Sequence, residues 1–330
     1  MMNAALIIRY GDFAEYLFRD LIENPEVNTF YLNKPIKNGP IRFIHKIHTS
    51  HKINNVIALP FKEIWNPIRP MVEQAYRAEA FIFIISSLEC VDLYYLQSFK
   101  KAIGERKMVL VITDSMNAHS NNLSITKPLI FGFDWDLILS YDKEDCLKYN
   151  FTYFGFSYYS FHQDDNQESN VYDLYSIFNR KHGEESREKL LAQIAKACAQ
   201  NNVTSKLTLV IGANKIPTNT NNIEYLSKGI AYKEIIHNIN KSNCILELLQ
   251  PGQHQQTVRY FEAVCYNKKL LTNNENIYSL PYYDERYMKV FKKVDDIDFE
   301  WIKKEENIDY HYANDFSPNE LLNIIHDCFT

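Results

Sequence analysis

Three polar residues at short spacing, Thr257, Arg259 and Glu262, lie at the start of a predicted helix. Arg259 and Glu262 are three residues apart and therefore share one side of that helix. A helix N-terminus has unpaired N–H groups and a positive dipole end, which together form a natural anion site. A guanidinium there can hold a phosphate, and a carboxylate can accept two ribose hydroxyls. These are the two recognition tasks that a nucleotide-sugar presents.

A strand and a tight loop precede this helix. Residues Cys244–Leu249 form a short apolar run, which predicts a buried strand that stops at Pro251 and Gly252. From Thr257 onward, three apolar residues recur on one helical face: Val258, Phe261 and Cys265. The sequence therefore predicts a strand, a loop and a helix N-terminus arranged around an anion.

A family resemblance becomes visible in this segment. Gln250-Pro-Gly-Gln253, together with Thr257, Arg259, Glu262 and the following Asn267–Asn273, resembles bacterial GT-B-type glycosyltransferases of capsule, exopolysaccharide and lipopolysaccharide synthesis. The chain departs from the pattern at one place. It has Gln255-Gln256 where the family usually has Gly-Leu, which affects the closest backbone approach to the donor.

Two further segments share the resemblance. Asp136–Tyr149 is similar to the segment that precedes the domain crossover in these proteins, and Tyr312–Phe329 is similar to their C-terminal helix. The family also carries basic residues that face the donor diphosphate in the loop that includes Asn179–Arg187 here. The resemblance therefore implies the following donor-binding set: Arg180, Lys181, Arg187, Gln250, Gly252, Thr257, Arg259 and Glu262. It implies no metal and no cofactor, the nucleotide-sugar being a co-substrate.

Strand and helix patterns alternate along the whole chain, which predicts parallel sheets covered on both faces. Predicted strands are 4–8, 29–32, 56–58, 80–85, 108–113, 137–140, 173–178, 207–211, 244–249 and 269–271. Predicted helices are 13–22, 41–48, 64–76, 93–103, 184–199, 232–239, 257–266 and 318–328. We expect an α/β, GT-B-like protein with two doubly wound, Rossmann-like domains and an interdomain cleft.

A composition change marks the expected boundary between these domains. The aromatic-rich stretch 151–161 is followed by the polar stretch 163–170. The resemblance assigns residues 1–160 to the acceptor side and residues 161–330 to binding of the nucleotide-sugar donor. Ligands in open parallel sheets bind beyond the carboxyl ends of the strands, so the loops that follow the strands are expected to face the cleft.

The catalytic base is harder to place than the donor site. Asp12 follows the first predicted strand and Asp114 follows the strand 108–113, so both are candidates for the base that receives the acceptor proton. Aspartates at such positions are more often helix caps or turn residues. His45, His48 and His51 recur every third residue and titrate near neutral pH, although polar positions on a helix explain them as well.

Asp134-Trp-Asp136 offers an alternative chemistry. It resembles the D-x-D signature by which GT-A enzymes hold a divalent metal on the donor diphosphate. A metal-dependent GT-A-type transferase that uses Asp134 and Asp136 is therefore one alternative. A nucleotide- or sugar-binding protein of the GT-B fold without transferase activity is another.

Composition excludes several classes of function. The net charge of −5 argues against general nucleic-acid binding, which needs a basic field. No P-loop and no G-x-G-x-x-G motif occur. The six cysteines are scattered without a C-x-x-C pair, and the N-terminus has the pattern of a strand rather than a signal peptide. These features predict a cytoplasmic protein with reduced thiols.

One segment has an unusual charge distribution. Val27–Lys62 contains no Asp or Glu, and its basic residues within 34–52 are Lys34, Lys37, Arg42, Lys46 and Lys52. This segment predicts either an ordinary surface helix or peripheral contact with an anionic membrane, at the inner face of the cell membrane. Together with the resemblance, these observations predict a glycosyltransferase that moves a sugar from a nucleotide-sugar, in particular a UDP-sugar, to a surface-polysaccharide or lipopolysaccharide acceptor, either a glycan or a lipid-linked glycan.

Overall fold

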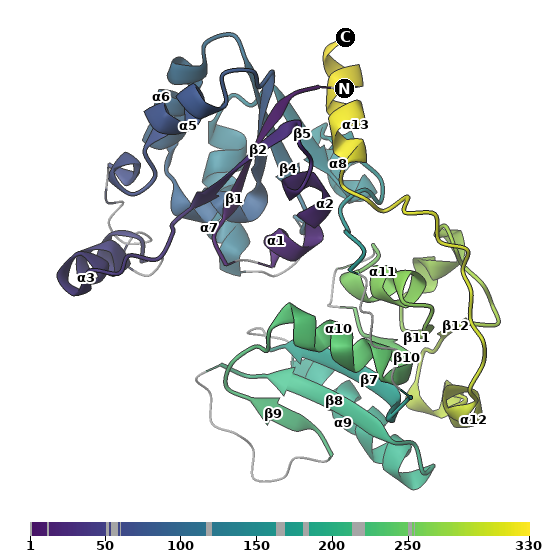
Figure 1. The fold of residues 1–330 in the computed structure, drawn as a ribbon. Coiled ribbons are helices and arrows are strands. Elements are labelled where there is room, and N and C mark those ends of the chain that lie inside the picture. Colours follow the sequence, from purple (N-terminus) through teal and green to yellow (C-terminus); the bar gives the residue numbers. More distant parts are fainter. Residues whose placement is uncertain are drawn as a thin grey trace. The chain divides into compact units, whose positions relative to one another are not determined.

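The computed structural model describes residues 2–11, 13–50, 53, 59, 61–116, 121–162, 169–180, 185–212, 222–249, 253 and 255–330. The predicted strand at 56–58 lies outside these residues. The chain forms two compact units (Figure 1), and the first contains Met1–Ser160 together with Asp315–Thr330. The second contains Phe161–Asn314. Residues 315–330 therefore belong to the first unit, which corrects their assignment to the second domain.

Six parallel strands form the sheet of the first unit, in the order β2-β1-β3-β4-β5-β6. Their bounds are β1 Ala4–Arg9, β2 Val27–Leu32, β3 Ala80–Ile84, β4 Lys107–Ile112, β5 Leu137–Ser140 and β6 Thr152–Tyr153. Ala5 and Ile7 of β1 enter one hydrophobic cluster, and Leu6 and Ile8, which point to the opposite face, are also fully buried. Burial on both faces explains why this strand is apolar throughout.

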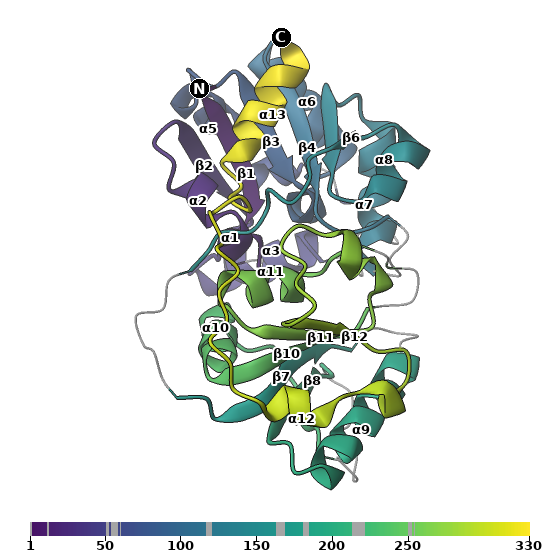
Figure 2. The same cartoon turned by 90° about the vertical axis from the view of Figure 1, so that its right-hand side faces the viewer.

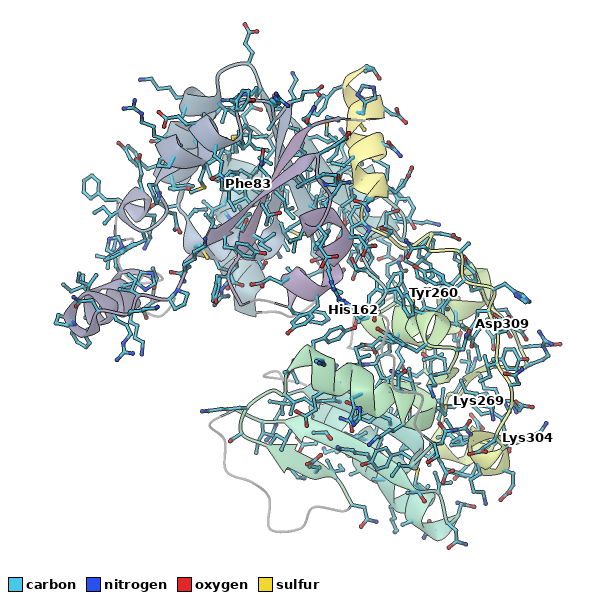
Figure 3. All side chains as sticks on the ribbon, in the orientation of Figure 1. Phe83, His162, Tyr260, Lys269, Lys304 and Asp309 are labelled. Atoms are coloured by element: carbon cyan, nitrogen blue, oxygen red, sulfur yellow. The ribbon has the colours of Figure 1, made fainter. Side chains whose placement is uncertain are left out.

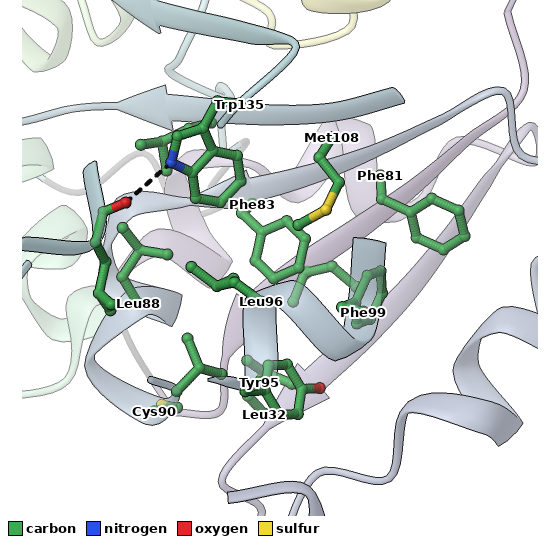
Figure 4. Close-up of a cluster of buried hydrophobic side chains, with 14 of the residues drawn as sticks. Leu32, Phe81, Phe83, Leu88, Cys90, Tyr95, Leu96, Phe99, Met108 and Trp135 are labelled. Carbon is green, nitrogen blue, oxygen red and sulfur yellow. Dashed lines mark hydrogen bonds between the residues drawn. The ribbon is translucent and has the colours of Figure 1, made fainter. Parts of the chain in front are cut away.

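Helices and 3-10 turns connect these strands. They are α1 Ala14–Leu17, α2 Arg19–Ile22, α3 Gly39–His48, η1 Lys62–Ile64, α5 Ile68–Gln74, η2 Ile85–Cys90, α6 Leu93–Ile103, α7 Asn121–Gly132, α8 Lys143–Tyr149 and α13 Glu320–Phe329. The aromatic rings of Phe83, Phe99 and Trp135 meet edge to face at the centre of the core (Figure 4). The ring of Phe83 lies 5.3 Å from that of Phe99 and 5.5 Å from that of Trp135. Such edge-to-face pairs stabilise a core beyond the area that they bury.

A second six-stranded parallel sheet forms the other unit, in the order β12-β11-β10-β7-β8-β9. Its strands are β7 Tyr172–Asn179, β8 Ser205–Val210, β9 Glu224–Leu226, β10 Ser242–Glu247, β11 Lys269–Thr272 and β12 Met288–Val290. Its helices and turns are α9 Glu185–Gln200, α10 Tyr232–Asn240, α11 Val258–Cys265, η3 Glu275–Ser279, η4 Val294–Asp296 and α12 Phe299–Lys303. Both sheets thus have the doubly wound organisation that the alternating pattern predicts.

Several elements differ from the sequence-based prediction. The single helix expected at 13–22 is two short helices, because Phe18 has φ −104° and ψ 21° and interrupts the helical conformation. The helix expected at 64–76 begins only at Ile68, after Pro67 in an extended conformation. Helices α7 and α8 and the strands β6, β9 and β12 were not predicted. The three strands have two or three residues each, too few to show a periodicity.

A buried lysine fastens the segment after α12 to the second sheet. Lys269 of β11 is fully buried (Figure 3), and its Nζ donates to the carbonyl oxygens of Trp301, at 2.7 Å, and Lys304. Glu306 lies 3.5 Å from the same nitrogen. Two carbonyls and a carboxylate thereby compensate for burial of the ammonium group.

The chain then returns to the first unit, where α13 packs (Figure 2). Backbone and side-chain hydrogen bonds hold the returning segment. The amide of Tyr159 donates to the carbonyl of Phe316 at 2.9 Å, and the Ser317 hydroxyl donates to Asp20 at 2.6 Å. Leu321, Leu322 and Ile325 of α13 are buried. The apolar face of α13 is thus buried against the first unit.

A buried carboxyl positions the loop after β4. Asp145 of α8 is fully buried, and its Oδ2 accepts a hydrogen bond of 2.6 Å from the amide of Met116. Its other oxygen, Oδ1, has no partner in the described structure. Burial raises the pKa of the Asp145 carboxyl to about 6, with Asp142 adding to the shift and Lys148 opposing it. The loop held in this way contains Asp114.

This raised pKa predicts that the first unit loses stability as pH rises. The folded state binds the proton more tightly than the unfolded state, whose pKa is 3.8, so stability falls between about pH 4 and 6 and then levels off. Asp145→Asn should raise the free energy of unfolding at pH 8 by up to about 3 kcal/mol and change it little at pH 4. Urea denaturation at both pH values measures this effect. The exposed neighbour substitution Glu144→Gln is the control, and an equal gain at both pH values would contradict the explanation.

Candidate functional site

The carboxyl ends of the central strands in the second sheet lie at one edge. β10 ends at Glu247, which is in register with Thr272 of β11, and β7 ends at Asn179. The Oδ1 of Asn273 accepts a hydrogen bond of 2.8 Å from the amide of Leu249, which ties the segment after β10 to the end of β11. Because ligands of open parallel sheets bind at this edge, its side chains are the first candidates for a site.

Glu247 is the hub of this edge. Its carboxylate is fully buried, and Oε1 accepts hydrogen bonds from the amide of Thr257 at 3.1 Å and from its hydroxyl at 2.6 Å. Oε2 accepts a hydrogen bond of 2.5 Å from the Thr272 hydroxyl. Burial raises the pKa of the Glu247 carboxyl, and these hydrogen bonds oppose the shift. Sequence reasoning missed Glu247, although an acidic residue inside the apolar run 244–249 was a visible signal.

Thr257 begins α11. Its hydroxyl oxygen accepts a hydrogen bond of 3.1 Å from the amide of Arg259, in the manner of an N-cap residue. The same hydroxyl donates to Glu247, so the position of the cap is fixed from the strand side as well. The predicted order of strand, loop and helix N-terminus is present. Gln250 and Gly252, which belong to the loop, lie outside the described residues.

Arg259 and Glu262 form an ion pair on one side of α11. The Arg259 guanidinium contacts Glu262 through Nη1, and its Nη2 lies 3.5 Å from the carbonyl oxygen of Ile177 in β7. The second Glu262 oxygen accepts a hydrogen bond of 2.9 Å from the Tyr232 hydroxyl. The Arg259 side chain is 14% exposed, whereas that of Glu262 is 0% exposed. The guanidinium is therefore held in place, and the side chain as a whole retains limited access to solvent.

This burial differs from the expectation that Glu262 accepts ribose hydroxyls. Both carboxylate oxygens already contact protein groups, and no part of the side chain reaches solvent. Burial raises the pKa of the Glu262 carboxyl, and the charge of Arg259 opposes the shift. In this conformation the Glu262 carboxylate orients the Arg259 guanidinium. The spacing of the two residues predicted that they share one side of the helix, but it could not show which of them faces inward.

Gln256 is a polar residue that sequence reasoning noted only as a departure from the family pattern. Its side chain is 1% exposed, and neither its Oε1 nor its Nε2 has a hydrogen-bond partner in the described structure. An unpaired buried amide group costs about 1–3 kcal/mol. Gln256 directly precedes Thr257, at the N-terminus of α11. Gln256 therefore adds one unpaired donor group and one unpaired acceptor to this edge.

The basic residues after β7 have protein partners. Arg180 lies 3.0 Å from Glu188 of α9. Arg187 donates a hydrogen bond of 2.7 Å to the carbonyl oxygen of Asn179, and its guanidinium lies 5.1 Å from the ring centroid of Phe178. Arg187 therefore bridges the start of α9 and the end of β7. Lys181 lies outside the described residues.

No family model and no curated protein matches the chain. A solved α-glucosyltransferase in complex with UDP and a 13-mer DNA containing a central A:G mismatch matches with a TM-score of 0.54 and 11% sequence identity, over 99% of this chain and 100% of that one. An α-glucosyltransferase in complex with UDP and a 13-mer DNA containing an HMU base matches with a TM-score of 0.50, 11% identity and the same coverage.

The chain has the GT-B fold. Its two six-stranded parallel sheets with flanking helices match the two Rossmann-like domains of that architecture. The fold expected from the sequence is thereby confirmed. Glu247 lies in the second of the two units.

The GT-B fold and the position of Asp136 both argue against the GT-A alternative. Asp136 directly precedes β5, so it lies at the amino end of that strand, opposite the edge where ligands bind. Its Oδ2 pairs with Lys100 and accepts a hydrogen bond of 2.7 Å from the amide of Met108. Among the described residues, no group of three or more His, Cys, Asp or Glu side chains is arranged to hold a metal.

The candidate bases lie in the first unit. Asp114 is exposed two residues after β4, at the carboxyl edge of that sheet. Asp12 and His51 lie outside the described residues. His45 is buried, and its ring packs against Trp65 with the centroids 4.9 Å apart. Burial and the neighbouring His48 lower the pKa of His45. His45 thus has a packing role in the described structure.

Substitutions in the Arg259–Glu262 ion pair test whether Glu262 compensates for the partly buried charge of Arg259. Glu262→Gln leaves the positive charge of Arg259 without its counter-ion, so it should lower the free energy of unfolding by about 3 kcal/mol. The double variant Arg259→Gln, Glu262→Gln should recover part of that loss. Urea denaturation of the wild type, both single variants and the double variant gives the coupling energy. Strictly additive losses would show that the two side chains do not depend on each other.

Proposed function

We propose that this protein is a glycosyltransferase that takes a sugar from a nucleotide-sugar, in particular a UDP-sugar. One observation carries the proposal: a GT-B chain holds an arginine at the capped N-terminus of α11, at the carboxyl edge of its second sheet. The matching α-glucosyltransferases, which are in complex with UDP, support the choice of nucleotide. The proposal makes the second unit the donor side.

The proposed chemistry is electrostatic. When the sugar leaves its donor, negative charge grows on the nucleoside diphosphate, and fixed N–H dipoles and cations stabilise that charge most effectively. Arg259 and the first amides of α11 would supply both. We assign Glu262 to positioning Arg259 and retain Arg180, Lys181, Arg187, Gln250, Gly252 and Thr257 as further donor-site residues. Diphosphate binding of this kind needs no metal ion, so activity should survive EDTA.

On the acceptor side, we propose a growing surface-polysaccharide or lipopolysaccharide chain. The resemblance of the segments around 136–149, 250–273 and 312–329 to polysaccharide glycosyltransferases supports this choice. Asp114 and Asp12 are the proposed candidates for the base that takes the acceptor proton. Both follow strands of the first sheet, where an acceptor would lie beyond the carboxyl ends.

A second candidate function is nucleotide-sugar binding without transfer. Gln255-Gln256 replaces the Gly-Leu of the resembling family, and Gln256 is a buried amide where that family has an apolar side chain. Donor hydrolysis separates the two functions, because a transferase releases free sugar and nucleoside diphosphate slowly even without an acceptor. A binding protein would retain the donor intact.

Thermal unfolding with a panel of nucleotides and nucleotide-sugars tests the proposal most directly. A ligand at 100 times its dissociation constant stabilises the folded state by about 2.7 kcal/mol. We expect UDP-sugars to raise the unfolding temperature more than nucleosides do. The same panel with EDTA examines whether a metal contributes. A panel without any stabilising nucleotide would contradict the proposed donor site.

Arg259→Lys tests the diphosphate contact. Lysine keeps the positive charge near Glu262 but loses the planar fork of donors that suits a diphosphate. We expect the affinity for UDP to fall by about tenfold, which corresponds to about 1.4 kcal/mol, and the affinity for uridine to stay unchanged. Isothermal titration calorimetry measures both. Equal weakening of UDP and uridine would place the diphosphate elsewhere.

Gln256→Leu tests whether the buried amide serves a ligand. Removing a buried group that has no partner among the described residues should increase the free energy of unfolding by about 1–3 kcal/mol. If a bound UDP-sugar is the missing partner, the same substitution should weaken its binding. Gln255→Leu, at the partly exposed neighbouring position, is the matched control. A loss of stability in Gln256→Leu would show that the amide has a structural role instead.

A further inference from the structure

The helix α3 in the first unit has an unusual orientation. Its N-terminus is capped by Asn38, whose side chain accepts a hydrogen bond from the amide of Ile41 at 3.4 Å, and Pro40 lies in its first turn. A surface helix normally packs its apolar face on the core. In α3 the buried residue is His45, which is 7% exposed. The helix therefore presents a polar residue to the protein.

Polar contacts hold α3 in this orientation. The indole nitrogen of Trp65 donates a hydrogen bond of 2.7 Å to Nδ1 of His48, and the His45 ring packs against the same indole. Lys62, itself buried, donates to the carbonyl oxygen of His48. Two histidines, a tryptophan and a lysine thus fix one side of the helix to the segment around η1.

The helix α3 also leaves large apolar side chains in solvent. Phe43 is 66% exposed and Ile44 is 57% exposed. Ile41 and Ile47 are also exposed, as are Phe61 and Ile64 beside the contacts that Lys62 and Trp65 make with α3. We call these six residues the α3 apolar patch. Figure 1 shows α3 standing out from the sheet of the first unit, at the end of the segment that leaves β2.

Basic residues adjoin the part of this patch that lies on α3, whereas the exposed acid Glu63 adjoins its other part. Arg42 and Lys46, four residues apart on α3, neighbour each other and flank Phe43, and all three are exposed. Lys34 and Lys37 are exposed in the segment that leads into the helix. No Asp or Glu occurs from Val27 to Lys62, although the whole chain carries a net charge of −5. The positive charge is therefore local to the patch.

We propose that the α3 apolar patch docks on an anionic lipid membrane. An amphipathic helix of this kind lies in the plane of the interface, with its apolar residues among the acyl chains and its basic residues at the headgroups. Charge complementarity favours this partner over a second copy of the chain, because two copies that met through this same basic segment would repel each other. No helix in the described part of the chain is long and apolar enough to cross a membrane, so the contact would be peripheral. The proposal does not depend on the donor site.

Co-sedimentation of the full chain with vesicles tests the proposal. We expect recovery with phosphatidylglycerol-containing vesicles and little recovery with phosphatidylcholine alone. Binding should weaken when salt is raised from 0.05 to 0.5 M, because the Debye length shrinks from more than 10 Å to less than 5 Å. Recovery with neutral vesicles equal to that with anionic ones would overturn the proposal.

Two double variants separate the apolar and the charged contributions. Phe43→Ser with Ile44→Ser should reduce vesicle affinity by at least about tenfold, since each side chain loses its transfer into the acyl layer. Arg42→Gln with Lys46→Gln should reduce affinity for anionic vesicles by about fivefold per residue. All four positions are exposed, so the unfolding temperature should stay unchanged. Wild-type affinity in both variants would contradict the proposal.

Matched controls come from other surfaces of the same unit. Leu147→Ser removes an apolar side chain that is 89% exposed on α8, and Lys101→Gln removes an exposed charge on α6. Neither should affect vesicle binding. Size-exclusion chromatography with light scattering tests the competing occupant. A dimer that the Phe43→Ser, Ile44→Ser variant converts to monomers would show that the patch binds a second copy, and the membrane proposal would then be wrong.

Discussion

The carboxylate of Glu247 is the constraint on which the geometry of the second unit depends. It stands at the end of a central strand, out of contact with water, and such burial is costly unless each oxygen has hydrogen-bond donors. Those donors come from Thr257 and Thr272, so the carboxylate links the end of β10 to β11 and to the start of α11. A local electrostatic requirement thereby fixes the relative positions of three elements.

The position of Arg259 follows from that constraint. Because Thr257 is held by Glu247, the first turn of α11 starts at a defined point above the sheet edge. Glu262, one turn later, then orients the guanidinium, and Tyr232 of α10 restrains Glu262 in turn. The arginine is thus supported by side chains that are themselves buried. Such support is what a preorganised anion site requires, since rigid donors need no reorganisation when a charge arrives.

Most of the fold could be predicted from the sequence because the central strands are apolar on both faces. β5 and α6 have the predicted bounds, and the alternation of strands and helices correctly indicated two parallel sheets. What the sequence could not show depends on tertiary contacts. The break at Phe18 and the return of residues 315–330 to the first unit have no local signature. The same holds for the candidate site: the spacing placed Arg259 and Glu262 on one side of α11, but only the structure shows that Glu262 is buried and bonded to Tyr232.

The return of α13 has a consequence for how the protein is made. A ribosome synthesises residues 161–314 before it synthesises residues 315–330. The first unit therefore lacks its last helix during the whole synthesis of the second unit. During that interval, Asp20 lacks the Ser317 hydroxyl and Tyr159 lacks the Phe316 carbonyl. The surface that later packs Leu321, Leu322 and Ile325 is uncovered for the same time. The first unit, although begun earlier, is therefore completed only after all residues of the second unit have been synthesised.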